Sequence, residues 1–353
     1  MLDFVIVGQG LAGTCLAWRL RRLGRRVLVL DSRSIASSSR IAAGLITPVT
    51  GQRLAKSWRL DEFWPVAVLF YRGIEAETGR RFFHPGPMIR LFTDASEQGR
   101  YRNREQTLLR GLVVPLSPPL NPDDFDAASG GFLMPTAARL DVQEFLDASR
   151  ERFLADGSFR EATLDPAQDV ERIPDGVRIP PQDVTARGVI FCQGFAATGN
   201  PWFPQMPFNP VKGEILTMRI PDLSETRVIH RGIWLAPAAN GLYRAGATYE
   251  REQIDAVPTT AGREEICRRL RELLRRPFEV VDHHAGVRPV IRESRPVLAT
   301  HPLHGSRIAI FNGLGSKGSL IAPYFAEELA QHLVADRPLE RSLGFPNQRG
   351  ESV

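Results

Sequence analysis

The segment FVIVGQGLAGTCLAWRLRRLGRRVLVLD, residues 4–31, decides the fold class of this 353-residue chain. It opens with the β-branched run of a strand that a parallel sheet buries on both faces. A glycine-rich turn follows, and then a helical pattern that places Leu16, Leu20 and Leu23 on one face. A second apolar run ends at Asp31. Strand, glycine-rich turn, helix, strand and acid in this order are the pattern of a dinucleotide-binding unit.

The residue types in this pattern each have a physical reason. Gly8 permits the tight turn, Gly10 lets the backbone approach a pyrophosphate, and Gly13 lets the helix pack on the strand. The N-terminus of the helix faces the phosphates. Asp31 can accept hydrogen bonds from ribose hydroxyls, and an acid at this position argues against NADP, which leaves FAD or NAD. The alternative interpretation is a glycine-rich turn followed by a surface aspartate.

A hydroxyl-rich turn, residues 34–39, then leads to a short helix and Gly44 without a third strand of the dinucleotide unit. This stretch alone is also typical of an ordinary loop. It resembles, however, a segment of the FAD-dependent D-amino-acid oxidase and glycine oxidase superfamily, where a serine-rich stretch wraps the diphosphate and the flavin end of FAD. Further segments match that superfamily in order, and the resemblance covers residues 3–335. They are GVIFCQG at 188–194, PVKGEIL at 210–216, GLYRAGAT at 241–248, AGVRP at 285–289 and GLGSKG at 313–318.

The resemblance implies an α/β protein with two domains and FAD as the cofactor. One is a Rossmann-like FAD-binding domain of the glutathione-reductase type, and the other is an α+β substrate domain with an antiparallel sheet. The FAD-binding domain is expected to be discontinuous, at residues 1–80, 136–205 and 285–335. The substrate domain is expected at residues 81–135 and 206–284, and residues 336–353 are expected to form a loose C-terminal tail.

Residues expected to bind FAD come from all the matched segments. They are Gly8, Gly10, Leu11, Ala12, Gly13, Asp31, Ser32, Ser38, Ser39, Arg40, Ala43, Gly44, Leu45, Cys192, Gly194, Arg288, Gly313, Leu314, Gly315, Ser316, Lys317 and Gly318.

Three residues are expected at the reaction centre. A guanidinium binds a carboxylate bidentately, and in the family the arginine that matches Arg288 does so; the alternative is an interface salt bridge, for example with Glu293. Lys317, before the last long helix, would add positive charge beside the flavin, unless it is a solvated surface residue. Trp234 matches an aromatic pocket residue of related oxidases, although a tryptophan in a strand is more often part of the core. Possible pocket residues without a motif are Tyr71, His84 and His230.

The expected reaction is FAD-dependent oxidation of the C–N bond of a small amino acid or N-substituted glycine to an imine, which water hydrolyses. Within the superfamily, residues 314–318 and 246–249 are most similar to the oxidase domain of bifunctional enzymes of tRNA methylaminomethyl-uridine biosynthesis, although no fused methyltransferase domain is expected for this chain. Glycine oxidase shares the pattern of residues 211–214. Two alternatives therefore stay open: removal of a carboxymethyl group from a wobble uridine of tRNA, and dinucleotide binding without catalysis.

Composition narrows the remaining function classes. The net charge is +5, but only three of the 45 basic residues are lysines, which is more typical of genomic base composition than of a recognition code. The most basic stretch, a predicted helix at 261–276, is expected to be a solvated face, with contact to tRNA phosphates as the alternative. No run approaches the ~18 apolar residues of a membrane helix, and no signal peptide is visible, so no membrane partner is expected.

The cysteines indicate the compartment. Cys15, Cys192 and Cys267 are scattered and have no metal-ligand spacing. Reduced thiols in a cytoplasmic protein without a metal site are therefore expected. The oligomeric state is left open by the sequence.

Overall fold

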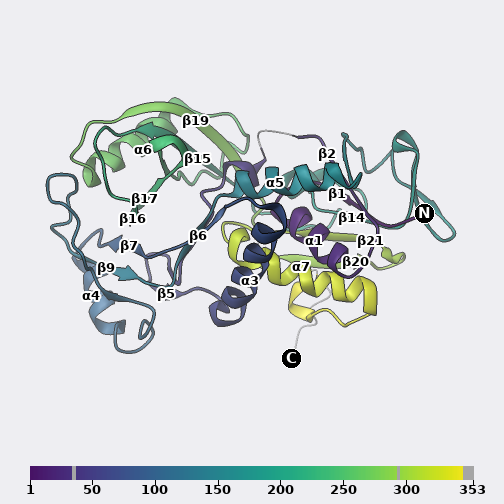
Figure 1. Ribbon diagram of the computed structural model, residues 1–353, viewed down its shortest axis with the longest axis horizontal. Coiled ribbons are helices and arrows are strands. Elements are labelled where there is room, and N and C mark those ends of the chain that lie inside the picture. Colours follow the sequence, from purple (N-terminus) through teal and green to yellow (C-terminus); the bar gives the residue numbers. More distant parts are fainter. Residues whose placement is uncertain (34–36, 292–294, 345–353) are drawn as a thin grey trace.

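The structure is a computed structural model that describes residues 1–33, 37–291 and 295–344. Two large sheets lie at opposite ends of its long axis (Figure 1). Helices α1 (Leu11–Arg22), α3 (Leu60–Thr78), α5 (Val142–Ala155) and α7 (Gly318–Ala335) gather around the first sheet, while α4 (Ala95–Arg104) and α6 (Thr260–Leu273) accompany the second. The α/β class is as the sequence predicts, and so is the Rossmann-like layer built on the first sheet.

The first sheet is built on the predicted dinucleotide unit. β1 pairs in parallel with β2 and β14, β2 with β11, and β14 with β21, whereas β12, β13 and β20 are antiparallel additions. Alternate residues of β1 enter two cores: Phe4 and Ile6 pack on the helices, and Val5 and Val7 pack on the other side. The strands are β1 (Leu2–Val7), β2 (Val27–Asp31), β11 (Phe159–Glu161), β12 (Glu171–Ile173), β13 (Gly176–Ile179), β14 (Val184–Phe191), β20 (Val297–His301) and β21 (Gly305–Asn312).

The helix over residues 142–155 shows why the local sequence folds as it does. Asp141 is its N-cap, and the carboxylate accepts a hydrogen bond of 3.2 Å from the backbone N–H of Glu144. Phe145, one turn into the helix, is fully buried in the core that α1, α3 and α7 share. A side-chain cap and an inward phenylalanine therefore fix the start of this helix.

The second sheet runs in the order β19, β15, β18, β17, β16, β7, β9, β8. Every pairing in it is antiparallel except that of β16 with β7, which is parallel. α6 covers one face through the buried Ile266 and Leu270. The strands are β7 (Met88–Leu91), β8 (Val114–Pro115), β9 (Gly131–Met134), β15 (Val211–Arg219), β16 (Val228–Arg231), β17 (Ile233–Pro237), β18 (Tyr243–Gly246) and β19 (Glu279–Arg288).

Smaller elements join the two layers. β3 (Leu45–Ile46) and β6 (Phe83–Pro85) flank β10 (Ala138–Leu140), and β4 (Val49–Thr50) forms a hairpin with β5 (Ala55–Lys56). The predicted boundary between residues 284 and 285 falls inside β19, which pairs with β15 along its length. The domain limits otherwise stay predictions. The remaining helices are α2 (Ser38–Ile41) and the 3-10 turns Pro180–Gln182, Gly194–Gly199, Ala239–Gly241 and Arg341–Leu343.

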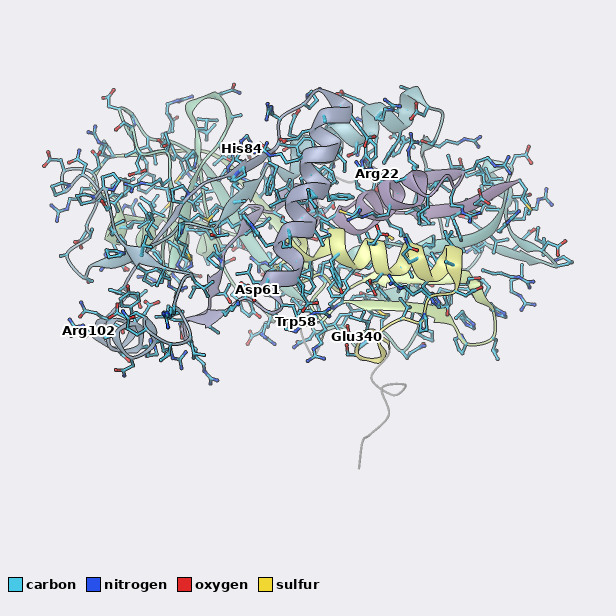
Figure 2. All side chains as sticks on the ribbon, turned by 60° about the horizontal axis from the view of Figure 1, so that its bottom comes forward. Arg22, Trp58, Asp61, His84, Arg102 and Glu340 are labelled. Atoms are coloured by element: carbon cyan, nitrogen blue, oxygen red, sulfur yellow. The ribbon has the colours of Figure 1, made fainter. Side chains whose placement is uncertain are left out.

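The described part of the C-terminal segment is not a loose tail, in contrast to the prediction. Leu343 is fully buried in the helical core, and Glu340 forms an ion pair of 2.8 Å with Arg59 at the start of α3. Figure 2 shows Glu340 beside Trp58 and Asp61 at that end of α3. An apolar side chain and an ion pair therefore hold residues 337–344 on the domain; residues 345–353 lie outside the described residues.

Candidate active site

The glycine-rich turn between β1 and α1 has no room for side chains. A Cβ atom at Gly8 would lie 2.5 Å from the carbonyl oxygen of Cys192, and one at Gly13 would lie 1.9 Å from the carbonyl oxygen of Gly8. Gly8 also has a φ of +105°, which side chains disfavour. The Leu11 N–H, in the first turn of α1, donates to Ser39 Oγ at 3.1 Å, so α2 lies against this turn. A phosphate group can therefore approach the N-terminus of α1 closely.

Asp31 ends β2 at the edge of this crevice. Its carboxylate accepts hydrogen bonds of 2.7 Å from the backbone N–H groups of Gln9 and Arg33. These two donors fix the carboxylate beside the turn and leave it lining the cavity described next. This is the position from which an acid can reach a ribose.

A cavity of about 710 Å³ extends from the glycine-rich turn to the face of the second sheet. Most of the predicted cofactor-binding and catalytic residues line it, although they come from segments far apart in the chain. They are Gly8, Gly10, Leu11, Ala12, Asp31, Ser32, Ser38, Ser39, Ala43, Gly44, Leu45, Cys192, Gly194, Trp234, Arg288, Leu314, Gly315, Ser316, Lys317 and Gly318.

Three predicted cofactor-binding residues do not line the cavity, and each has a packing or pairing role instead. Gly13 brings α1 onto β1, as its contact with Gly8 shows. Arg40 pairs with Asp147 of α5 at 2.8 Å. Gly313 has a φ of +79°, and a Cβ atom there would lie 2.4 Å from a side-chain carbon of Ile291. Direct contact with a ligand in the cavity is therefore not expected of these three.

Arg288 lies at the sheet end of the cavity and has no carboxylate partner among the described residues. Its guanidinium lies over Gly213, where a Cβ atom would be 2.0 Å from the nearest nitrogen. Its hydrogen bonds within the described part of the chain are long, at 3.4 Å, and go to the carbonyl oxygens of Lys212 and Thr248. Burial lowers the pKa of Arg288, yet arginine stays charged at neutral pH. The alternative partner, Glu293, lies outside the described residues.

Trp234 is partly buried and lines the cavity, so it is not simply a core residue. The absence of a side chain at Gly246 on the neighbouring strand makes room for its ring, since a Cβ atom there would lie 2.9 Å from Trp234 Cζ2. His230 pairs with Trp234 across β16 and β17 and also lines the cavity. The other two suggested pocket residues do not: Tyr71 is buried and donates to the Ser319 carbonyl, and His84 is exposed (Figure 2).

Lys317 is partly buried in the cavity wall and is not the solvated residue of the alternative interpretation. Its ammonium donates to the hydroxyl oxygens of Thr50 at 3.2 Å and Ser57 at 3.3 Å. It has no ion-pair partner in the described ranges, and burial lowers its pKa from 10.5. A largely uncompensated positive charge thus faces the cavity from the loop before α7.

Several cavity-lining residues could not be found from the sequence. They are Thr47, Thr50, Ser57, Thr163, His230, Asp255 and Asn312, of which only His230 was suggested, without a motif. Thr50 and Ser57 reach the cavity because the β4–β5 hairpin folds back on itself, and no spacing indicates that fold. Gln193 also lines the cavity and lies inside the matched segment 188–194, so its place between the predicted Cys192 and Gly194 was the available signal.

Residues 3–332 match the family model described as FAD dependent oxidoreductase. The chain belongs to this family. It is therefore an oxidoreductase, and its cofactor is FAD. The alternative of a binding protein without catalysis is not retained. In the described part of the chain, no three metal-ligating side chains are grouped to hold an ion, and no helix is both long and apolar enough to span a bilayer.

Individual relatives of this flavoprotein are distant. It is 23% identical to the glycine oxidase of Bacillus licheniformis, over 99% of this chain and 98% of that protein. It is 27% identical to the tRNA 5-methylaminomethyl-2-thiouridine biosynthesis bifunctional protein of Maricaulis maris over 94% of this chain, which spans only 52% of that relative's length. The fold is similar to that of glycine oxidase from Geobacillus kaustophilus, with a TM-score of 0.80, 19% identity and coverage of 98% of both chains.

The residues present fit FAD. The crevice at Gly8 and Gly10 can admit a diphosphate at the α1 N-terminus, because both glycines line the cavity without a side chain of their own and the hydroxyl of Ser39 lies beside the turn. Asp31 can hold the ribose at one end of the cavity, and Lys317 supplies positive charge toward the other. A cation near the ring suits FAD, since the reduced flavin carries negative charge.

Arg244 links the cofactor segment to the second sheet. This partly buried residue of β18 donates at 3.2 Å to the carbonyl oxygen of Ala42 and also to that of Ile41, at the C-terminal end of α2. A cation at the last carbonyls of a helix is electrostatically favourable. Because α2 carries Ser38 and Ser39 into the cavity wall, Arg244 helps to place them.

Substitution of Arg244 with alanine is expected to weaken FAD binding about tenfold, since two partly buried carbonyl groups lose a charged donor. The measurement is fluorescence quenching of FAD added to the apoprotein. Arg269→Ala is the matched control, because Arg269 bonds the Gly232 carbonyl on the surface of α6, away from the cavity. Equal FAD affinity for the Arg244 and Arg269 variants would contradict the role given to Arg244.

Proposed function

We propose that this flavoprotein oxidises the C–N bond of a small amino acid or N-substituted glycine. The observation that carries the proposal is Arg288, a partly buried cation without a carboxylate partner among the residues described, at the sheet end of the FAD cavity. Such a fork binds a substrate carboxylate with both orientation and energy. The similarity to glycine oxidase supports the same substrate class.

The chain's residues would bind and orient the substrate. Arg288 holds the carboxylate, while Trp234 and Ile215 form apolar walls that limit water around the substrate carbon. FAD, when bound, supplies the acceptor for two electrons. The C–H bond breaks and its hydrogen leaves with the electron pair as a hydride equivalent for that acceptor, while the nitrogen lone pair forms a C=N bond and the nitrogen releases one proton to water. Water then adds to the imine and releases the amine and an oxoacid.

Lys317 is proposed to stabilise the negative charge that reduction places in the cavity. Its ammonium has two hydroxyl partners, Thr50 and Ser57, and neither neutralises it. An unneutralised charge in a partly buried site acts more strongly than one in water.

The rate of flavin reduction is expected to fall as pH rises through the pKa of Lys317. Burial lowers that pKa from 10.5, so the neutral amine appears at a lower pH than in a free lysine, and the stabilising charge is lost above it. Anaerobic stopped-flow measurements across the alkaline range test this. In Lys317→Arg, the decrease in rate should move to higher pH. In Lys317→Met, flavin reduction should be about tenfold slower and should show no such decrease at alkaline pH. An unchanged alkaline profile in both variants would contradict this role.

Anaerobic titration of the holoprotein tests the proposed function. Sarcosine, glycine, other N-alkyl glycines, and D- and L-amino acids are added in turn while flavin absorbance is followed. At least one member should bleach the flavin and yield the corresponding oxoacid. If none of them reduces it, the proposal is wrong.

A second candidate, removal of a carboxymethyl group from a wobble uridine of tRNA, is favoured by the similarity to the bifunctional tRNA proteins. The helix proposed for phosphate contact is largely neutralised, however: Arg268 pairs with Glu272 at 2.5 Å and Arg269 with Glu265 at 2.8 Å. Salt-sensitive binding of tRNA, with a slope set by the number of phosphates neutralised, would support this candidate. Reduction by free sarcosine without tRNA binding would exclude it.

A further inference from the structure

The segment between β18 and α6, residues 247–259, is called the strap here. It contributes Asp255 and Ala256 to the wall of the cavity, and its Thr248 carbonyl accepts hydrogen bonds from Arg288. The strap therefore touches both the cavity and the residue proposed to bind the substrate carboxylate. The contacts that hold the strap in place can therefore affect how Arg288 binds a substrate carboxylate.

Both ends of the strap are tied to β15. Near its start, the backbone groups of Lys212 and Glu250 exchange hydrogen bonds of 2.9 and 3.0 Å. Thr248 Oγ1 also accepts from the backbone N–H of Glu214 at 2.9 Å. These bonds continue the sheet past the end of β18 and bring the Thr248 carbonyl beside Arg288.

At its far end the strap is held by the buried Glu214 carboxylate. It accepts from the backbone N–H of Thr259 at 2.9 Å and from its hydroxyl at 2.8 Å, and His283 Nε2 lies 2.7 Å away. A Cβ atom at Gly262 would lie 2.5 Å from this carboxylate, so a side chain at this position of α6 would displace the carboxylate from its place beside Thr259. In Figure 1, α6 lies against β15 and β19, consistent with this anchor.

Between these anchors, one ion pair crosses from β15 to the strap. Lys212 is fully buried, and its ammonium lies 2.6 Å from Asp255 Oδ1. The ammonium lowers the pKa of Asp255 to about 2, so the pair is charged at neutral pH. No second carboxylate pairs with Lys212 in residues 1–33, 37–291 and 295–344. Because a buried charge with one partner is costly to separate, this pair resists opening of the strap.

The position of the Arg288 guanidinium depends on the backbone of β15 and of the strap. Its three hydrogen bonds to described residues are each 3.4 Å long, and they end on the carbonyl oxygens of Lys212 and Thr248. Bonds of this length do not aim a guanidinium by themselves. Its orientation therefore follows the relative position of β15 and the strap.

We propose that Lys212 is a positioning residue for substrate binding. Its ion pair with Asp255 holds the strap against β15, which keeps the Thr248 carbonyl in place and Arg288 aimed into the cavity. The inference rests on the proposed function in that Arg288 binds the substrate carboxylate. It adds that affinity for carboxylates is set by a residue which does not line the cavity.

Lys212→Met tests this proposal in the holoprotein. The dissociation constants of acetate and methoxyacetate, which cannot be oxidised as amines, are measured by perturbation of the flavin spectrum. They should rise about tenfold, as should KM for the best amine, while kcat stays within about twofold, because uniform binding is lost. Trypsin cleavage after the exposed Arg251 of the strap should become faster. Lys212→Arg should restore carboxylate affinity.

Two further variants test whether the effect of Lys212→Met comes from loss of its ion pair with Asp255. Lys56→Met is the matched control, because Lys56 pairs with Asp61 at 2.5 Å on the surface and should change none of these readouts. Asp255→Asn changes the partly exposed partner and should act in the same direction if Lys212→Met folds poorly.

Unchanged carboxylate affinity and unchanged cleavage in Lys212→Met and Asp255→Asn would overturn the proposal. So would a loss of FAD or of melting temperature with no shift in carboxylate affinity. If no amine reduces the flavin but carboxylate affinity and cleavage shift as expected, the proposed function fails while the positioning role holds.

Discussion

Arg288→Lys is expected to lower kcat/KM for the amine substrate by about 100-fold to 1,000-fold, because a lysine cannot replace the planar fork that binds a carboxylate with two parallel bonds. The lysine side chain is also shorter in its reach over Gly213, where the guanidinium now lies. Anaerobic stopped-flow reduction of the flavin as a function of substrate concentration measures the loss. The effect should fall largely on affinity, since the carboxylate is bound before the C–H bond breaks.

The control for this loss is Arg251→Lys. Arg251 is an exposed residue of the strap that bonds Asn209 and Tyr249, and its replacement should leave kcat/KM within about twofold. FAD content is recorded for both variants, because Arg288 was also predicted to contact the cofactor. If Arg288→Lys keeps its FAD and its kcat/KM, the substrate carboxylate binds elsewhere in the cavity.

Gly13→Ala is expected to abolish stable FAD binding. The added Cβ atom would lie 1.9 Å from the Gly8 carbonyl oxygen, so α1 must move away from β1. Overpacking of this kind costs about 1–3 kcal/mol and shifts the backbone, here at the turn that receives the diphosphate. The flavin-to-protein absorbance ratio of the purified protein gives the result.

Gly99→Ala is the matched control, because it adds the same methyl group at a position where no neighbouring atom is in the way. Gly99 lies inside α4, and a Cβ atom there would meet nothing within 4 Å. That variant should keep its FAD and gain about 1 kcal/mol of stability, because alanine favours the helix. If Gly13→Ala binds FAD as tightly as the unchanged protein, the crevice does not hold the cofactor as described.

The first layer of the fold was predictable because its signals are local. β1, α1 and β2 lie within one short stretch, and the β-branched strand run, the glycine spacing and the helical spacing of leucines all act over a few positions. The second sheet was harder to derive, because its strands come from distant segments. Two features depend on strands that are distant in the sequence, which no local pattern indicates. They are the parallel pairing of β16 with β7 and the continuation of β19 past residue 284.

The candidate site divides in the same way. Glycine spacing and matched motifs led to Gly8, Asp31, Arg288 and Lys317, all of which line one cavity. Gly13, Arg40 and Gly313 were grouped with them, yet their roles in packing and pairing appear only when neighbours are known. The hydroxyls of Thr50 and Ser57 around the Lys317 ammonium carry no motif.

The linear order of residues was sufficient for a glycine crevice at the end of a buried strand, because backbone conformation and close packing depend on which residue types adjoin. The sequence alone could not show that no carboxylate among the described residues pairs with the Arg288 guanidinium. Nor could it show that the Lys212 ammonium lies 2.6 Å from the Asp255 carboxylate. Charges act through distance, and distances between residues far apart in the chain exist only once the two sheets have folded.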